Sequence, residues 1–333
     1  MRIAINGFGR IGRAVFRILN RMDGMEVVAV NDLADNEALA YLLKYDTVMG
    51  RFPGVIEINA DTMRTRFQTV KMTDFSDPAE LPWKELGVDY VVEATGAFRK
   101  RAQLAMHLEA GASKVILTVP AKDEIDCTVV LGVNESDLTS DHRIVSNASC
   151  TTNCLAPIAK VLHEKFGIVS GVMTTVHAYT NDQRLADVPH TDWRRSRAAA
   201  ENIIPTTTGA ARAVGKVLPA LDGRLDGMAM RVPIADGSIV DLVTTLERDT
   251  TADQINDAVR AAAESDEMKP ILRYSEAPIV SKDIVGEPHS CIFDAPLTQV
   301  VDGRFAKTFS WYDNEWGYSN RVVDLLKLLD RLG

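Results

Sequence analysis

The sequence predicts an α/β protein of two domains, a doubly wound parallel sheet followed by an α+β domain with a mostly antiparallel or mixed sheet. Three observations support this. Strand-like and helix-like segments alternate through the first half of the chain. The second half holds several strands with fewer helices between them. The length of 333 residues also exceeds the size at which one hydrophobic core normally keeps growing.

The first predicted strand, Arg2 to Asn6, runs into a glycine-rich turn and then into a helical pattern. The first glycine of such a turn permits a tight bend, and the second lets the backbone approach a diphosphate. The third lets the helix pack closely on the strand. This Rossmann-type pattern predicts a dinucleotide site. The turn reads Gly7-Phe8-Gly9-Arg10-Ile11-Gly12.

A second predicted strand, Glu26 to Val30, is followed by Asn31 and Asp32. Asp32 lies about 20 residues beyond Gly12, where the ribose-binding acid of this fold is expected. A carboxylate there accepts hydrogen bonds from a ribose 2′-hydroxyl and repels a 2′-phosphate, and no Arg or Lys follows at once. The sequence therefore favours NAD over NADP. The alternative interpretation of Asp32 is a helix cap or turn residue.

The alternation continues with predicted strands over 88–93, 114–119 and 127–133, and with a helix that Gly111 ends. Thr95, Gly96 and Thr118 follow these strands at their carboxyl ends, where a dinucleotide would lie. They could equally be ordinary turn residues.

A cysteine then opens a second helical pattern, at Ser149-Cys150-Thr151-Thr152-Asn153-Cys154. A helix N-terminus stabilises a thiolate and a developing oxyanion, and the neighbouring hydroxyl groups suit a phosphate. The alternative is a buried, inert cysteine. We expect Gly167 to end this helix and Pro157 to kink or shorten it.

The strand predicted from Gly171 to Thr180 carries a candidate partner for this thiol. Its period of two places Thr175, His177 and Tyr179 on one face. A neutral imidazole can act on a cysteine first as a base and then as an acid. The sequence alone does not show that His177 meets Cys150.

Basic and hydroxyl side chains mark candidate anion sites further along the chain. The irregular stretch 180–197 contains four arginines, which in a chain of charge −9 indicate an anion site or a subunit contact; the alternative is a solvated basic face. The run from Pro205 to Gly209 precedes an alanine-rich helical pattern and resembles the start of a phosphate-binding helix. Arg231 lies in a strand on the face opposite to its methionines.

Composition narrows the class further. The chain is 46% hydrophobic and 25% charged, and its net charge of −9 disfavours nucleic acid or an acidic membrane surface as a partner. No signal peptide or membrane-spanning apolar run is visible, and the four cysteines lack the spacing of a metal site or a disulfide framework. We expect a cytoplasmic protein without a metal.

Five motifs carry a resemblance that covers essentially the whole chain. They are Ile5 to Arg13, Ser146 to Cys154, His177 to Thr180, Pro205 to Gly209 and Trp311 to Glu315. In these motifs the chain resembles the phosphorylating glyceraldehyde-3-phosphate dehydrogenases. The resemblance implies a homotetramer, an NAD-binding Rossmann domain over 1–148 that the C-terminal helix 315–333 completes, and a catalytic domain over 149–314.

The resemblance also implies roles for individual residues. Cys150 is the nucleophile and His177 the base in converting glyceraldehyde 3-phosphate, NAD and inorganic phosphate to 1,3-bisphosphoglycerate through a thiohemiacetal and a thioester. The implied cofactor residues, besides Gly7, Gly9 and Gly12, are Arg10, Ile11, Asp32, Ser76, Thr118 and Asn314. The implied phosphate-binding residues are Ser149, Thr151, Thr180, Arg195, Thr208, Gly209 and Arg231. Ser76 departs from the family, since many relatives place an arginine there; a backbone contact to the adenine survives this change, and side-chain stacking does not.

Two other functions stay open. Erythrose-4-phosphate dehydrogenase shares the fold, the cysteine and the histidine, although the runs 177–180 and 206–209 fit the triose enzyme better. A non-enzymatic thiol redox sensor or RNA-binding partner on the same fold would be favoured by loss of His177 or of the arginines, and the sequence retains both. Cys154 is either a disulfide partner for Cys150 or a helix-packing thiol.

Overall fold

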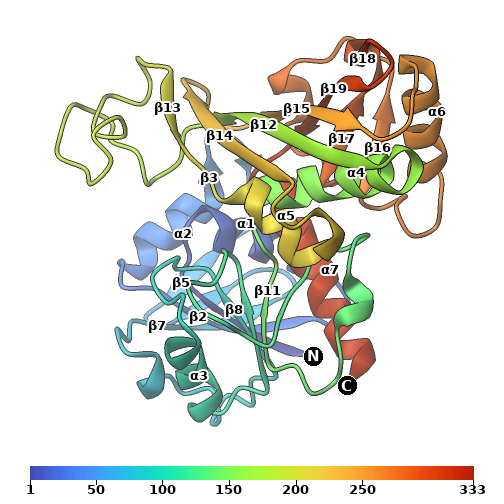
Figure 1. Cartoon of the computed structure of the whole chain (residues 1–333). Coiled ribbons are helices and arrows are strands. Elements are labelled where there is room, and N and C mark those ends of the chain that lie inside the picture. The colour runs from blue at the N-terminus through green and yellow to red at the C-terminus, as the bar shows by residue number, and fades with distance from the viewer. The chain divides into compact units, whose positions relative to one another are not determined.

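The computed structural model describes all 333 residues, and the chain divides into two compact units. Unit 1 comprises Met1–Val129, Ser136–Ala148 and Ser319–Gly333, and unit 2 comprises Val130–Glu135 and Ser149–Tyr318. Figure 1 shows the elements of both units along the chain. The short segment Val130–Glu135, which the sequence places in the first domain, belongs to unit 2.

Unit 1 is built on a nine-stranded sheet in the order β10-β11-β9-β8-β1-β2-β7-β6-β5. Neighbouring strands are parallel from β10 to β7, and the last two pairings are antiparallel. A separate hairpin joins β3 (Tyr45–Asp46) to β4 (Gly50–Arg51). The sheet strands are β1 (Arg2–Asn6), β2 (Glu26–Asn31), β5 (Glu57–Asn59), β6 (Thr62–Arg64), β7 (Thr69–Thr73), β8 (Tyr90–Glu93), β9 (Lys114–Leu117), β10 (Cys127–Thr128) and β11 (Ile144–Ser146).

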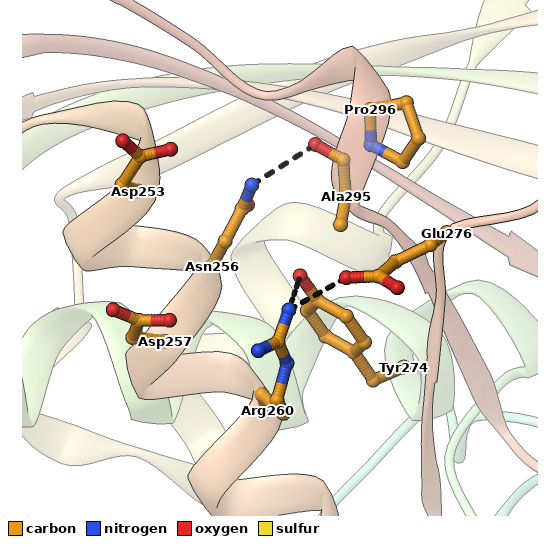
Figure 2. Close-up of a pocket in the computed structure, with 8 residues that line it drawn as sticks. All are labelled: Asp253, Asn256, Asp257, Arg260, Tyr274, Glu276, Ala295 and Pro296. Atoms are coloured by element: carbon orange, nitrogen blue, oxygen red, sulfur yellow. Dashed lines mark hydrogen bonds and ion pairs between the residues drawn. The ribbon is translucent and has the colours of Figure 1, made fainter.

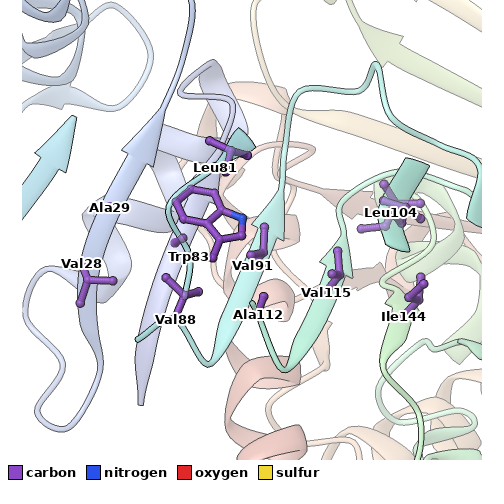
Figure 3. Packing of buried hydrophobic residues seen from close by; sticks show 12 residues of the cluster. Val28, Ala29, Leu81, Trp83, Val88, Val91, Leu104, Ala112, Val115 and Ile144 are labelled. Carbon is purple, nitrogen blue, oxygen red and sulfur yellow. The ribbon is translucent and has the colours of Figure 1, made fainter. Parts of the chain in front are cut away.

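Helices cover both faces of this sheet, which confirms the predicted doubly wound architecture. Trp83 and Leu104 pack with Ala4 and Val91 in one apolar cluster, seen in Figure 3. The opposite face carries the first helix, since a Cβ at Gly12 would lie 3.3 Å from the Cγ2 of Ile5. The helices are α1 (Arg10–Leu19), α2 (Asn36–Lys44), α3 (Arg101–Glu109) and α7 (Trp316–Leu332), of which Ser319 onward belongs to unit 1.

One predicted strand of the first domain is much shorter than the sequence indicates. The run 127–133 forms a strand only over Cys127–Thr128. Beyond it the chain turns, because the side-chain oxygen of Asn134 accepts a hydrogen bond from the Val130 N–H at 2.9 Å, and the Val133 N–H donates to the Val130 carbonyl at 3.0 Å. Local side-chain bonds of this kind compete with a sheet ladder.

Unit 2 contains an eight-stranded mixed sheet in the order β13-β14-β12-β15-β19-β17-β16, with β18 paired to β19. Most pairings are antiparallel, as predicted, but β12 with β14 and β16 with β17 are parallel. Three helices contact it: α4 (Cys150–Phe166), α5 (Ala210–Val217) and α6 (Ala252–Ala263). The strands are β12 (Ile168–Ala178), β13 (Ile204–Thr207), β14 (Leu225–Val232), β15 (Ser238–Leu246), β16 (Leu272–Ser275), β17 (Cys291–Asp294), β18 (Gln299–Val301) and β19 (Phe305–Tyr312).

Helix α4 continues through Pro157, so the expected shortening does not occur. A proline inside a helix costs about 3 kcal/mol, because it removes a hydrogen bond and crowds the preceding turn. Here α4 contacts four strands of the sheet, β12, β15, β17 and β19, and this burial offsets the cost. Gly167 ends the helix with φ of +73°, as predicted.

None of the helices combines the length and the apolar character that a membrane-crossing segment needs.

Candidate active site

The glycine-rich turn between β1 and α1 has the geometry of a dinucleotide site. Gly7 has φ of +93°, and a Cβ there would lie 2.6 Å from the Thr95 nitrogen; a Cβ at Gly12 would lie 2.1 Å from the Gly7 carbonyl oxygen. These two positions therefore exclude any side chain. Gly9 instead borders open space at the start of α1, where the N–H groups of the first turn have no partner within the helix. The turn thus offers an open, N–H-rich cradle that fits a diphosphate.

Asp32 follows β2 and faces this turn. One carboxylate oxygen accepts a hydrogen bond from the Phe8 N–H at 2.7 Å, and the other accepts from the Ala34 N–H at 3.0 Å. The cap of helix α2 is Asp35, which accepts from the Ala38 N–H at 2.9 Å. Asp32 is therefore not the cap of α2, and its position beside the turn fits the predicted ribose contact.

The other predicted cofactor residues differ in how many hydrogen bonds and ion pairs their polar groups already make within the chain. Arg10 in the first turn of α1 forms a two-pronged ion pair with Asp46, at 3.0 and 3.1 Å. Thr118 is buried, and both its N–H and its hydroxyl donate to the Glu93 carbonyl, at 3.1 and 3.0 Å. Ser76 is exposed after β7. Asn314 belongs to unit 2, where its side-chain oxygen accepts from the Ser238 hydroxyl at 2.7 Å.

Cys150 occupies the first turn of α4. Ser149 caps this helix, and its Oγ accepts a hydrogen bond from the Thr152 N–H at 3.1 Å. The prediction that a helix begins at Cys150 is therefore confirmed. Cys154 is fully buried, and its thiol donates to the carbonyl oxygens of Ser310 and Trp311 at 3.6 and 3.9 Å. Those contacts favour the helix-packing interpretation of Cys154.

The structure brings Cys150 and His177 together. The Sγ of Cys150 lies 3.5 Å from the Nε2 of His177, which is buried near the end of β12. Thr175 is buried on the same strand, whereas Tyr179 lies beyond the strand and is exposed, so only part of the predicted face is buried.

The other ring nitrogen of His177 has two competing partners. Its Nδ1 lies 2.7 Å from the Ala178 carbonyl oxygen and 2.7 Å from the Nη1 of Arg231, which also donates to that carbonyl at 2.9 Å. The carbonyl favours a proton on Nδ1, which leaves Nε2 as the acceptor facing the thiol. The guanidinium can only donate and favours the opposite tautomer. Arg231 therefore bears directly on which nitrogen of His177 faces the sulfur.

Burial and the charge of Arg231 set the protonation of this pair. Desolvation, with the positive charge of Arg231 as the next cause, lowers the pKa of His177 to about 3. Burial raises the pKa of the Cys150 thiol, and the Arg231 charge and hydrogen bonds from Thr151 partly oppose that rise. The imidazole is consequently neutral at pH 7 and keeps a lone pair on one ring nitrogen, while the lowered pKa weakens it as a base.

Tyr312 is a member of this site that the sequence interpretation did not single out. Its hydroxyl lies 2.8 Å from the Oγ1 of Thr151 and 2.8 Å from the Oγ1 of Thr175, and its ring meets the His177 ring edge-on with centroids 5.9 Å apart. The hydroxyl of Thr151, predicted to bind phosphate, is thus buried against Tyr312. The run Trp311 to Glu315 was recognised as a motif, so a signal for Tyr312 was present.

The remaining predicted anion-binding residues lie on and after the irregular segment between β12 and β13. Arg195 donates to the Thr206 hydroxyl at 2.9 Å and forms ion pairs with Asp182 and Asp192. Thr208 and Gly209 precede α5, where the Thr208 hydroxyl accepts from the Ala210 N–H at 3.2 Å. Thr180 is half-buried, and its N–H donates to the Gln183 side chain at 3.3 Å. No sequence pattern predicts the two aspartates that hold Arg195.

A surface pocket in unit 2 involves none of these residues. Figure 2 shows Arg260 in it, bonded to Glu276 at 2.6 Å and to the Tyr274 hydroxyl at 3.0 Å. Asp253 and Asp257 make the pocket acidic, which does not suit a phosphorylated ligand. The structure also brings together no group of three or more side chains able to hold a metal ion.

Two domains of one known protein family match the chain, one in each unit. The domain described as "Glyceraldehyde 3-phosphate dehydrogenase, NAD binding domain" matches residues 1–101. The domain described as "Glyceraldehyde 3-phosphate dehydrogenase, C-terminal domain" matches residues 149–314.

Curated relatives match over almost the full length of the chain. A glyceraldehyde-3-phosphate dehydrogenase of Geobacillus stearothermophilus is 57% identical over 326 residues, covering 98% of this chain and 97% of the relative. One from Streptomyces coelicolor is 56% identical over 327 residues, with the same coverage. One from Borreliella burgdorferi is 56% identical over 335 residues, covering 99% of each. With an NAD-binding turn in one unit and a helix-opening cysteine paired to a histidine in the other, the chain belongs to the glyceraldehyde 3-phosphate dehydrogenase family.

Proposed function

We propose that this chain oxidises glyceraldehyde 3-phosphate with NAD and joins the product to inorganic phosphate, giving 1,3-bisphosphoglycerate. The observation that supports this most directly is the 3.5 Å contact between the Cys150 sulfur and the His177 imidazole at the start of α4. A thiol, a neutral base and a helix N-terminus together are the requirements of covalent aldehyde chemistry.

Cys150 and His177 carry the covalent steps. The imidazole takes the thiol proton, the sulfur bonds to the aldehyde carbon, and the new alkoxide takes the proton back from the imidazolium to give a thiohemiacetal. His177 removes that hydroxyl proton again as the carbon is oxidised, which leaves a thioester on the sulfur. An oxygen of phosphate then attacks the thioester carbon, and the C–S bond breaks to release the acyl phosphate and the thiolate.

We assign most of the cofactor contacts to residues of unit 1. When bound, NAD supplies the oxidant that accepts a hydride from the substrate carbon. Gly7, Gly9 and Gly12 leave room for the diphosphate at the start of α1, and Asp32 accepts from the ribose hydroxyls. We also assign Arg10, Ile11, Ser76 and Thr118 to the cofactor, together with Asn314 of unit 2.

The anionic groups of the two substrates need basic and hydroxyl-bearing residues. One site is needed for the phosphate of the aldehyde substrate and one for the attacking phosphate. We assign to these two sites together Thr180, Arg195, Arg231, Ser149, Thr151, Thr208 and Gly209. A phosphate that engages Arg231 draws the guanidinium away from the Nδ1 of His177. The Nδ1 proton then bonds only to the Ala178 carbonyl, and Nε2 faces the thiol as a base.

We also propose that the chain acts in the cytoplasm as a homotetramer. Support comes from apolar side chains that one chain leaves uncovered. Leu185 and Trp193, in the arginine-rich segment, are 85% and 86% exposed. On the unit 2 sheet, Val172 and Met228 share an exposed face through the register of β12 with β14. Large exposed apolar side chains that share a face are typical of protein interfaces.

A phosphate-dependence assay tests the proposed function. Formation of NADH from glyceraldehyde 3-phosphate should require phosphate, and NADP and erythrose 4-phosphate should be poor replacements for NAD and the triose. The Cys150→Ser variant should lose turnover by at least a factor of about 10³ while binding NAD with near-parent affinity. Retained turnover in this variant, or faster reaction with erythrose 4-phosphate, would overturn the assignment.

A further inference from the structure

Polar side chains end four neighbouring strands of the unit 1 sheet and are hydrogen-bonded to one another across it. Asn6 ends β1 and donates to Glu93, the last residue of β8, at 2.7 Å. Asn31 ends β2 and donates to the Asn6 side-chain oxygen at 2.8 Å. Thr73 ends β7 and donates to the Asn31 side-chain oxygen at 2.9 Å. All four are buried, and we call this set the strand-end ladder.

Two further buried side chains hold the ladder from the side of β8. The indole N–H of Trp83 donates to the Nδ1 of His107 at 3.1 Å, and the Nε2 of His107 lies 3.1 Å from a Glu93 carboxylate oxygen. An indole N–H can only donate, so Nδ1 is an acceptor and the ring proton sits on Nε2, directed at Glu93. All three side chains are fully excluded from solvent, and Figure 3 shows Trp83 within its apolar surroundings.

The segments that follow these strands are bonded to the same residues. The Gly7 N–H donates to the Asn31 carbonyl at 2.8 Å, and the Phe75 N–H donates to the Asn31 side chain at 2.9 Å. The Thr95 N–H donates to Glu93 at 2.8 Å, and the Thr95 hydroxyl bonds to the same oxygen. Gly7 and Thr95 are also in close backbone contact. The ladder therefore sets the positions of three neighbouring loops at once.

A buried carboxylate is strongly unfavourable unless its oxygens are satisfied. Glu93 receives hydrogen bonds from Asn6, from the Thr95 N–H and hydroxyl, and from His107. Apolar side chains would fill this core without that requirement. We propose that Glu93 and His107 are positioning residues, which fix the glycine-rich turn in the conformation that accepts the NAD diphosphate. This inference rests on the proposed binding of NAD by that turn.

A pair of His107 variants tests the direction of the hydrogen bond. In His107→Gln the side-chain amide can still donate toward Glu93, in place of Nε2. In His107→Asn the shorter side chain can accept from Trp83, in place of Nδ1, but does not reach Glu93. The dissociation constant of NAD, measured by calorimetry on the full chain, should stay within about threefold of the parent for Gln and rise about tenfold for Asn. A purely structural histidine predicts equal affinities in the two variants.

Glu93→Gln provides an independent test. It replaces one accepting carboxylate oxygen with an NH₂ group, which cannot accept the hydrogen bonds that the oxygen receives. We expect NAD affinity to fall about tenfold and the KM for NAD to rise, while the KM for glyceraldehyde 3-phosphate stays unchanged. The matched control is Gln68→Leu. Gln68 is a buried side chain bonded to the Val27 N–H and the Met25 carbonyl, at the start of β2. This control should lower the melting temperature without changing NAD affinity.

Failure of this inference differs from failure of the proposed function. If Glu93→Gln and His107→Asn both bind NAD like the parent, the positioning role is wrong, even when the parent turns over normally. If Glu93→Gln does not fold, the Gln and Asn variants at position 107 decide the question. Alkylation of Cys150 by iodoacetamide without NAD should be equal in all variants, because it reports unit 2 alone. A parent that does not bind NAD would instead refute the proposed function.

Discussion

At the scale of single residues, the site combines a thiol with a base whose charge is suppressed. Cys150 gains from the helix N-terminus and from Arg231, while burial acts against its thiolate. His177 is held neutral by burial and by the same arginine. The two other unit 2 cysteines, Cys154 and Cys291, are fully buried, and burial raises the pKa of the Cys154 thiol well above its ordinary value. Within unit 2, reactivity should therefore be confined to the sulfur of Cys150.

Iodoacetamide at pH 7 should modify Cys150 and leave Cys154 and Cys291 intact, as peptide mapping by mass spectrometry can establish. His177→Asn should slow this modification by a factor of about ten or more, because the variant removes the base at 3.5 Å from the sulfur. Equal rates in parent and variant would mean that the imidazole does not activate the thiol.

The lowered pKa of His177 also makes stability depend on pH. Its pKa is about 3 in the folded chain against about 6.5 when unfolded, so between these values the unfolded state binds the extra proton. Stability from this residue is complete above pH 6.5 and is lost as the pH falls toward 3. Between pH 7 and pH 5 the parent should lose about 2 kcal/mol more than His177→Asn in urea unfolding. Parallel losses would contradict the suppressed charge of this residue.

At the scale of elements, the turn between β1 and α1 separates two uses of glycine. At Gly12 a methyl group would collide with the Gly7 carbonyl, whereas at Gly9 it would enter open space. Gly12 is therefore needed by the fold, whereas Gly9 is needed by a ligand that approaches the backbone.

Gly12→Ala and Gly9→Ala should therefore fail in different ways. Gly12→Ala should lose about 1–3 kcal/mol of stability through overpacking, seen as a lower melting temperature. Gly9→Ala should melt like the parent but bind NAD at least about tenfold more weakly. Unchanged NAD affinity in Gly9→Ala would show that the diphosphate does not lie on this turn.

Much of the architecture could be predicted because it depends on local patterns. The glycine spacing, the acid after β2 and the helix that begins at Cys150 each follow from short stretches of sequence. The strand expected over 127–133 failed because the Asn134 side chain turns the backbone, and hydrophobic content alone does not reveal that bond. The shortening expected at Pro157 does not occur, because packing of α4 on the sheet outweighs a local penalty.

The site could be predicted only in part. Cys150 and His177 were each recognisable, but their contact depends on how α4 and β12 pack. The bond between Arg231 and His177 depends on the register of β12 with β14, in which these two residues are paired. A single amino-acid sequence does not show which helices and strands pack together or in which register two strands pair.

At the scale of the whole molecule, one face of the unit 2 sheet leaves apolar side chains exposed among polar ones. Met173 and Leu242 are paired across β12 and β15 on the buried face. Val172 and Met228 lie on the opposite face, where Val172 is 61% exposed. A second copy of the chain would cover this face in the proposed homotetramer.

Val172→Glu should place a charge in that interface and shift the assembly to smaller species in sedimentation velocity. Val55→Glu is the matched control, because Val55 is similarly exposed but belongs to unit 1. It should leave sedimentation unchanged. A Val172→Glu chain that sediments like the parent would place the contact elsewhere.

The ion pairs of Arg195 with Asp182 and Asp192 have a further consequence for the proposed anion site. The Arg195 guanidinium is already paired with two carboxylates of the same chain. An incoming anion therefore competes with these carboxylates for the guanidinium. Chloride and other weak monoanions gain little from such an exchange, whereas a doubly charged phosphoester gains more. The ion pairs thus weaken the binding of every anion to Arg195, but they increase the selectivity for a doubly charged phosphoester over the other anions in a cell.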